Sequence, residues 1–163
     1  MISTKLTAQR LREVLVYDAL TGIFHWRVSR GRAKVGDVAG SLKTDGYREI
    51  SIDGRTYIAS RLAWLYVNGS WPKNEIDHWN GVRHDNRLTN MRDLTTSGNQ
   101  QNQRRASQDS QSGFLGASPH RGKFQAQITV NGKNRYLGMF ETPEAAHAAY
   151  VAAKRNLHST CTI

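Results

Sequence analysis

The sequence predicts an α+β fold divided into two small domains. Its first part alternates short strand-like runs with helical segments, and its last part has two strand-like runs followed by an alanine-rich helix. Between them, residues 100–112 read QQNQRRASQDSQS and contain a single apolar residue, Ala106. A chain of 163 residues that is 38% hydrophobic can bury one medium core or two small ones. We therefore predict domains at 1–103 and 113–158, joined by a linker at 104–112.

The charge balance indicates a polyanionic partner, with nucleic acid as the leading class. Lys and Arg number 23 against 13 for Asp and Glu, which gives a net charge of +10 spread along the chain. An ordinary basic soluble protein is the alternative. A membrane surface fits less well, because no run approaches the ~20 apolar residues of a membrane span.

The single cysteine and the N-terminus indicate a cytoplasmic protein. Cys161 has no intramolecular disulfide partner and excludes a zinc site built on cysteine pairs, which fits a reducing compartment. The opening residues, MISTKLTAQR, lack an apolar signal core, so we expect no export. No pattern indicates an obligate protein partner.

Cap and turn residues predict the elements of the first domain. Thr7 predicts the start of a helix whose apolar residues recur at helical spacing up to Leu15. Ser60 predicts the cap of a second helix, which Gly69 ends. A hairpin turn is expected at Asp53-Gly54. Three strands are expected before the second helix: 23–28, 46–52 and 56–59.

The heptapeptide EIDHWNG, residues 75–81, places a carboxylate beside an imidazole. Neighbouring residues of a regular strand point to opposite faces, so Asp77 and His78 can address one phosphate only near a strand end. A second strand at 87–94 and a polar helix beginning near Asn99 give the order strand, loop, strand, helix.

This order suggests the chemistry of a metal-dependent hydrolase. A carboxylate and an amide oxygen are hard ligands suited to Mg²⁺ or Mn²⁺, with positions left for water and phosphate oxygens. A neutral His78 could take a proton from an attacking water, because its reference pKa near ~6.5 suits a general base.

The stretch DHWNGVRHDNRLTNMRDLTTSGNQQNQ, with SRLAWLYVNGSWPKNEI before it, resembles the HNH endonuclease motif of bacteriophage homing-type nucleases. The resemblance implies a ββα-metal unit with one divalent ion, which cleaves a DNA phosphodiester and often nicks one strand. It implies Asp77 and Asn99 as metal ligands, His78 as the base, and Asn90 as the asparagine that braces the loop. Asn86 is the rival for the bracing role. Many members have His where this chain has Asn99, which favours Mg²⁺ or Mn²⁺ over Zn²⁺.

The last part of the chain predicts a small sheet with one helix. The run 124–130 alternates apolar and polar residues, Asn131-Gly132 predicts a hairpin turn into 134–140, and Thr142-Pro143 predicts the start of a helix to about Leu157. If the apolar residues of the first strand face the helix, its polar residues face outward, where they either read base edges and hold phosphates or form an ordinary solvated surface.

The segment SGFLGASPHRGKFQAQITVNGKNRYLGMFETPEAAHAAYVAAKRNLH is similar to an AP2-type DNA-binding domain. The similarity implies three antiparallel strands on one helix, with the sheet in the major groove of double-stranded DNA. The usual Trp of the family is Phe124 and Tyr136 here. The expected DNA-binding residues are Arg121, Lys123, Gln125, Gln127, Lys133, Arg135 and Tyr136.

Together these observations predict a site-specific, homing-type DNA endonuclease. Arg104 and Arg105 follow the expected metal helix, where they either grip the DNA backbone or are solvated linker charges. His25 and His147 are expected to be packing or surface residues. Two other classes stay open: a DNA-binding regulator with an inactive site, and an RNA-directed nuclease.

Overall fold

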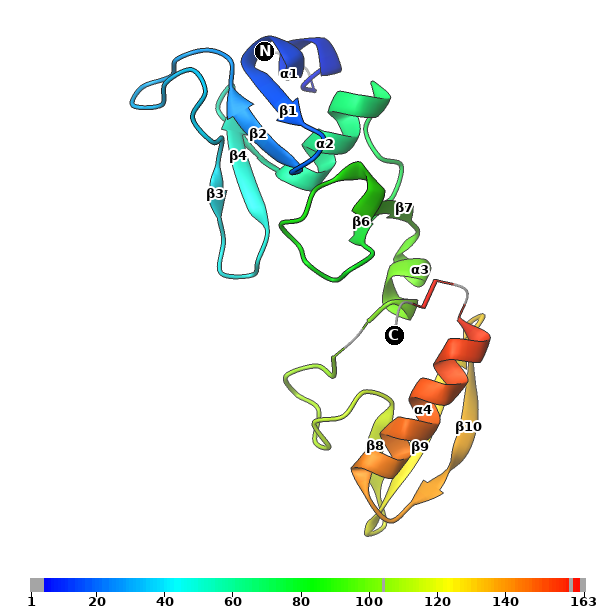
Figure 1. Cartoon of the computed structure of the whole chain (residues 1–163). Coiled ribbons are helices and arrows are strands. Elements are labelled where there is room, and N and C mark those ends of the chain that lie inside the picture. The colour runs from blue at the N-terminus through cyan, green and yellow to red at the C-terminus, as the bar shows by residue number, and fades with distance from the viewer. Residues whose placement is uncertain (1–4, 104, 159, 162–163) are drawn as a thin grey trace. The chain divides into compact units, whose positions relative to one another are not determined.

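The computed structural model describes residues 5–103, 105–158 and 160–161. It is a mixed α+β structure that divides into two compact units, Met1–Thr95 and Thr96–Ile163 (Figure 1). The division groups residues 96–112 with the second unit, while the domain boundaries at 103 and 113 stay predictions. Within the described residues, no helix is long and apolar enough to cross a membrane.

The first unit consists of short antiparallel strand pairs around two helices. β1 pairs with β2, β4 pairs with β3 and β5 on either side, and β6 pairs with β7. The elements are α1 Ala8–Val14, β1 Leu15–Asp18, β2 Ile23–Trp26, β3 Ser41–Leu42, β4 Arg48–Ile52, β5 Arg55–Ile58, α2 Ala59–Asn68, β6 Glu75–His78, the 3₁₀ turn η1 Leu88–Asn90 and β7 Met91–Leu94.

The first helix is shorter than predicted. Thr7 caps it as expected, and its side chain accepts a hydrogen bond from the Arg10 N–H at 3.1 Å. The expectation that Leu15 continues the helix is wrong, because Leu15 has extended backbone angles and opens β1 opposite Trp26. Both conformations bury Leu15, so its apolar character could not distinguish them.

The three expected strands are present with different bounds, 23–26, 48–52 and 55–58, and Ala59 begins α2 instead of ending a strand. The Asp53-Gly54 hairpin is confirmed, with both turn residues at positive φ. Ser60 as a cap is wrong: Ile58 precedes the first turn of α2, and Ser60 lies buried inside it. Gly69 ends α2 in the left-handed conformation, as predicted. The core of this unit forms between the helices and strands. Its fully buried large side chains are Phe24, Leu11, Leu15, Ile50, Ile52, Leu62 and Leu65.

Gly22, in the β1–β2 turn, packs directly on the segment that carries Asn86. Its φ is 74°, and a Cβ there would lie 2.5 Å from the Arg87 nitrogen. Gly54 has a similar φ of 79° but open space around it. We expect Gly22→Ala to lower the free energy of unfolding by about 1–3 kcal/mol more than Gly54→Ala, because only Gly22→Ala adds a backbone clash to the shared cost of positive φ. Urea unfolding of both variants measures this, and equal losses would contradict the contact.

The expected strand at 87–94 is only half right. Leu88–Asn90 form a single 3₁₀ turn, and the strand is limited to Met91–Leu94. In the register of the hairpin, Asp77 lies opposite Arg92 and His78 opposite Met91. The 3₁₀ turn places Asn90 at the end of the connecting loop.

The second unit is a three-stranded antiparallel sheet in the order β10-β9-β8, with one helix packed on it. The expected helix, hairpin and two strands are confirmed, and Thr142 caps the helix through the Ala145 N–H. The polar helix begins at Thr96 instead of near Asn99. The elements are α3 Thr96–Gln101, β8 Ala117–His120, β9 Lys123–Val130, β10 Lys133–Phe140 and α4 Pro143–Leu157.

Candidate active site

Asp77 and His78 occupy the last two positions of β6 and are both buried. The Asp77 carboxylate faces Arg92 across the hairpin, and Arg92 donates to Asp77 Oδ2 from Nε at 3.1 Å and from Nη2. His78 points the other way, as alternation in a strand requires, toward the loop that follows β6. The pair lies at the end of the strand, as expected, but its side chains point to opposite faces, so their action on one phosphate stays a prediction.

Arg92 also stacks on an exposed aromatic ring beside the site. Its guanidinium carbon lies 4.4 Å from the centre of the Trp79 ring, and Trp79 is 55% exposed. Arg92 is thus held by a carboxylate on one side and an indole on the other. Sequence reasoning missed Arg92 and Trp79, because their contacts depend on the register of β6 with β7.

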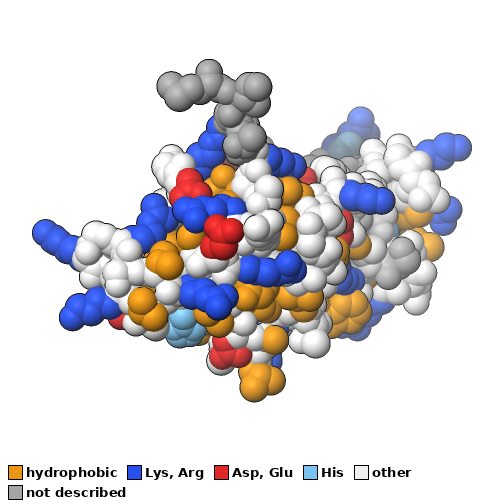
Figure 2. All heavy atoms as spheres, turned by 90° about the horizontal axis from the view of Figure 1, so that it is seen from above, with side chains coloured by type: hydrophobic (Ala, Val, Ile, Leu, Met, Phe, Trp, Pro, Cys, Tyr) orange, Lys and Arg blue, Asp and Glu red, His pale blue; other side chains and the backbone are white. Residues whose placement is uncertain are grey.

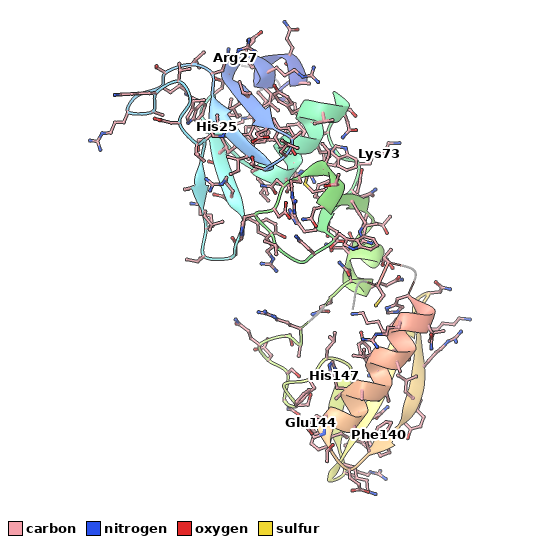
Figure 3. All side chains as sticks on the ribbon, viewed as in Figure 1. His25, Arg27, Lys73, Phe140, Glu144 and His147 are labelled. Atoms are coloured by element: carbon pink, nitrogen blue, oxygen red, sulfur yellow. The ribbon has the colours of Figure 1, made fainter. Side chains whose placement is uncertain are left out.

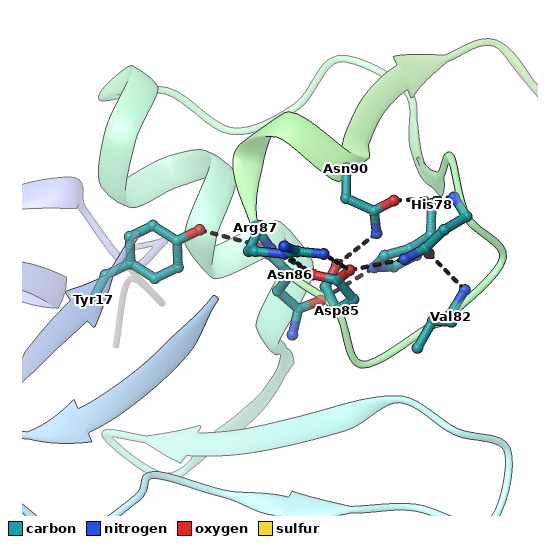
Figure 4. Close-up of polar contacts among 8 residues, drawn as sticks. Tyr17, His78, Val82, Asp85, Asn86, Arg87 and Asn90 are labelled. Carbon is teal, nitrogen blue, oxygen red and sulfur yellow. Dashed lines mark hydrogen bonds and ion pairs between the residues drawn. The ribbon is translucent and has the colours of Figure 1, made fainter. Parts of the chain in front are cut away.

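Asn90 ties the two halves of the connecting loop together. Its Oδ1 accepts from the Asn80 N–H at 3.0 Å, and its Nδ2 donates to the Asp85 carbonyl oxygen at 2.8 Å (Figure 4). The Trp79 N–H donates to the Asn90 carbonyl oxygen at 2.8 Å. These are the hydrogen bonds of a loop brace, the role expected of Asn90. Its contribution to catalysis stays a prediction.

Asn86, the rival for that role, contacts His78 itself. Its Oδ1 lies 3.1 Å from His78 Nε2, inside the loop (Figure 4). The Tyr17 hydroxyl donates to the Asn86 carbonyl oxygen at 2.7 Å. Burial lowers the pKa of His78 below its ordinary value, and the hydrogen bond to Asn86 acts in the opposite direction. The lowered pKa favours the neutral imidazole that a general base requires.

The β3–β4 hairpin reaches the same loop. The Tyr47 ring centre lies 6.2 Å from that of His78, and Arg83 lies over Tyr47 at 5.0 Å. Arg83 Nη1 donates to the Asp45 carbonyl oxygen at 2.8 Å. Sequence reasoning did not select Tyr47, which precedes His78 by 31 residues.

Asp85 makes the loop sensitive to acid. Its carboxylate accepts from Arg87 Nε at 2.7 Å and from Asn80 Nδ2 at 2.8 Å. Its pKa is lowered to about 2, chiefly by the side-chain hydrogen bond from Arg87. A lowered carboxyl pKa stabilises the fold above the ordinary value near ~3.9, and this stabilisation is lost as the pH falls through about 2.

We therefore expect Asp85→Asn to flatten the loss of stability between about pH 4 and 2. Urea unfolding at several pH values in this window, for the wild-type chain and Asp85→Asn, measures the change. Asp37→Asn is the matched control, since its carboxylate lies outside this loop and accepts from the Lys34 N–H. Parallel pH profiles for wild type and Asp85→Asn would contradict the linkage.

Asn99, the second expected metal ligand, lies in α3 and belongs to the second unit. Its pairing with Asp77 therefore stays a prediction, as does the ββα-metal arrangement. Among residues 5–103, 105–158 and 160–161, no group of three or more His, Cys, Asp or Glu could hold a metal ion. The expected ligands are one carboxylate, Asp77, and one amide, Asn99, and this pair would not form a group of that kind. The Asp77 carboxylate forms an ion pair with the positively charged guanidinium of Arg92.

The loop, its asparagines and the Asp-His pair all lie within one segment that has known relatives. Residues 57–101 match the HNH endonuclease family. The match begins in β5 and ends with α3, so it includes Asp77, His78, Asn90 and Asn99. It supports an HNH nuclease with a DNA substrate, and HNH nucleases generally use a divalent metal. No curated protein and no solved structure matches the chain.

The second unit presents a polar sheet face, as alternation in β9 predicted. Ala126 and Ile128 are buried, while Gln127 and Thr129 are exposed. Tyr136 pairs with Gln127 and is 63% exposed, so the two lie side by side on this face. By their cross-strand pairs, the face contains Ser118, His120, Lys123, Gln125, Gln127, Thr129, Asn134, Tyr136 and Met139.

Two expected DNA-binding residues, Lys133 and Arg135, lie on the opposite side of β10 from the polar face. Lys133 pairs with Val130 and Arg135 with Ile128, so both belong to the helix side of β10 and not to the polar face. Arg121 is exposed at the tip of the β8–β9 hairpin, beside that face. Arg105 is exposed, and Arg104 lies outside the described residues. Their roles in DNA binding stay predictions.

His25 and His147, both labelled in Figure 3, each contact a backbone carbonyl oxygen, which fits the packing or surface role expected of them. His25 Nδ1 lies 2.9 Å from the Gly36 carbonyl oxygen. His147 Nδ1 lies 2.7 Å from the Leu115 carbonyl oxygen and joins α4 to the segment before β8. Basic side chains are spread over the visible surface and not gathered in one patch (Figure 2). The distribution agrees with the scattered charges of the sequence.

Proposed function

We propose that this protein is a site-specific, homing-type DNA endonuclease that nicks one strand. The observation that supports this best is the buried His78, which ends β6 inside a loop braced by asparagine and lies within the HNH match. A single site per chain makes a nick the expected product of a monomer. The cytoplasm is the proposed location.

His78 acts as the general base in this proposal. Its lowered pKa favours the neutral imidazole, which can take a proton from the water that attacks phosphorus. Asn90 fixes the loop around the ring, and Asp77 adds a negative charge that favours the imidazolium formed by proton transfer.

Asp77 and Asn99 would hold a divalent ion, Mg²⁺ or Mn²⁺. A carboxylate and an amide suit these ions, which accept oxygen ligands and keep several waters. When bound, the ion supplies stabilisation of the negative charge that builds on the scissile phosphate. Arg92 is positioned to hold the Asp77 carboxylate in place.

Plasmid relaxation tests the proposal. Supercoiled DNA that carries the genomic neighbourhood of the gene is incubated with the protein and Mg²⁺ or Mn²⁺, with EDTA as the control. Nicking that requires the metal supports a nuclease. Binding without nicking under every metal tested would overturn it.

The second unit would select the DNA site through its polar sheet face. A sheet of this size with a helix behind it can enter the major groove, and glutamine can pair with adenine through two hydrogen bonds. Gln127 and Tyr136 lie together on this face, with Lys123 at its edge available for phosphate. We propose that this unit is an AP2-like DNA-binding domain, whose tether raises the effective concentration of the nuclease unit at its site.

We expect Gln127→Ala to lower the preference for the specific site by about 1–3 kcal/mol, the worth of one bidentate base contact. The measurement is the ratio of dissociation constants for a duplex selected by the protein and a random duplex, at fixed salt. Gln9→Ala, an exposed change on α1, is the matched control. An unchanged ratio in Gln127→Ala would remove this residue from base recognition.

A DNA-binding regulator with an inactive site is the second candidate. The ion pair between Arg92 and Asp77 favours it, because a metal ion must compete with the guanidinium for the carboxylate. Arg92→Ala tests this competition. An active nuclease should then need less metal for half-maximal nicking, whereas a chain that the ion pair keeps inactive should begin to nick.

A further inference from the structure

We propose that Asn86 is a positioning residue that fixes the tautomer of His78, with the proton on Nε2 and the basic lone pair on Nδ1. The catalytic meaning of this inference rests on the proposed function. The tautomer itself rests on geometry alone, so the tautomer and its catalytic consequence can be tested separately.

The contact between the two side chains sets the tautomer. Asn86 Oδ1 lies 3.1 Å from His78 Nε2, and an amide oxygen can only accept a hydrogen bond. Nε2 must therefore carry the proton. A neutral imidazole has one N–H, so Nδ1 is left as the acceptor. In Figure 4 the Asn86 oxygen points toward the His78 ring, and its nitrogen points away.

Asn86 is itself fixed by the N-terminal part of the chain. It is 1% exposed, and its carbonyl oxygen accepts from the Tyr17 hydroxyl at 2.7 Å. Its own N–H donates to the His84 carbonyl oxygen at 3.1 Å. A Cβ at Gly22 would lie 2.7 Å from the Asn86 carbonyl carbon, so the β1–β2 turn closes this side. Asn86 therefore cannot shift without moving β1 and β2, which lie outside the HNH match.

The two asparagines of the loop, Asn86 and Asn90, make different kinds of contact, although only one bracing asparagine was expected from the sequence. The Asn90 side chain bonds only to backbone groups, those of Asn80 and Asp85, and so determines the shape of the loop. The Asn86 side chain bonds to the His78 ring and so determines which ring nitrogen is basic. Loss of Asn90 should disorder the loop, whereas loss of Asn86 should leave the loop and release the ring.

Nitrogen-15 NMR of the full chain, labelled at histidine, measures the tautomer directly. Spectra are recorded without DNA at a pH where His78 is neutral, and His78→Gln assigns its signals. We expect the Nε2–H form in the wild-type chain. Asn86→Asp keeps an accepting oxygen and should keep this form, whereas Asn86→Leu fills the space without an acceptor and should give a mixture. An Nδ1–H form in the wild-type chain overturns the proposal, and this result needs no variant to fold.

Nicking rates test the catalytic consequence. Asn86→Leu should lower the rate by about 10- to 100-fold with unchanged DNA affinity, as loss of a residue that orients a reacting group does. Asn86→Asp should restore a larger share of the rate. A wild-type rate in Asn86→Leu would overturn the positioning role. If the wild-type chain shows the Nε2–H form but nicks no DNA with any divalent metal, the proposed function fails and the tautomer stands.

Discussion

His78→Ala is expected to lower the DNA nicking rate by about 10² to 10⁴-fold, the range that a general base contributes. The substitution removes the proton acceptor and leaves Asp77 and the loop brace of Asn90 in place. Because the His78 ring is buried, it offers little surface to DNA, and affinity should stay at the wild-type level. Single-turnover nicking of a plasmid and a binding titration in EDTA measure the two quantities.

His84→Ala is the control for this prediction. His84 lies in the same loop but is exposed, and its backbone carbonyl oxygen accepts from the Asn86 N–H, so the variant should nick at the wild-type rate. Circular dichroism and thermal unfolding establish that both variants are folded. If His84→Ala loses nicking and His78→Ala keeps it, the base has been assigned to the wrong histidine. Loss of DNA binding in His78→Ala would assign the residue to the interface.

The second unit could be predicted closely because its signals are local. Asn131-Gly132 sets a two-residue turn, alternation in β9 sets its faces, and Thr142-Pro143 sets the start of α4. The same turn pairs Lys133 with Val130 and Arg135 with Ile128, so their place on the helix side could have been read from the sequence. The bulge between Tyr136 and Gly138 shifts the pairing only from Gly138 onward, and no local pattern indicated it.

The first unit was harder to predict from the sequence, because its contacts join distant parts of the chain. The strand end at His78 follows from the turn residues after it, and the brace role of Asn90 was implied by the resemblance to the HNH motif. Tyr17, by contrast, reaches Asn86 across 69 positions, and no local pattern carries that information. The choice between Asn86 and Asn90 was open because both match recurrent asparagines of the family. In the structure Asn90 bonds to the loop backbone and Asn86 to the His78 ring.

Asp77→Asn is expected to lower the nicking rate by about 10²-fold or more at saturating DNA. The change keeps the size of the side chain but removes the charge that would hold a divalent ion. The ion contributes several kcal/mol to the transition state, and about 2.7 kcal/mol corresponds to about a hundredfold in rate. DNA binding should stay equal or become tighter, because the substitution removes a negative charge that repels phosphate.

Slower nicking with equal or tighter DNA binding is the result expected when a metal-binding carboxylate is lost. Nicking rates across a series of Mg²⁺ and Mn²⁺ concentrations, with DNA affinity measured in EDTA, separate the two effects. Asp37→Asn removes the same charge from another turn of the first unit and controls for net charge. If Asp77→Asn nicks at the wild-type rate with the same metal requirement, Asp77 is only the structural partner of Arg92, and the metal ligands must lie elsewhere.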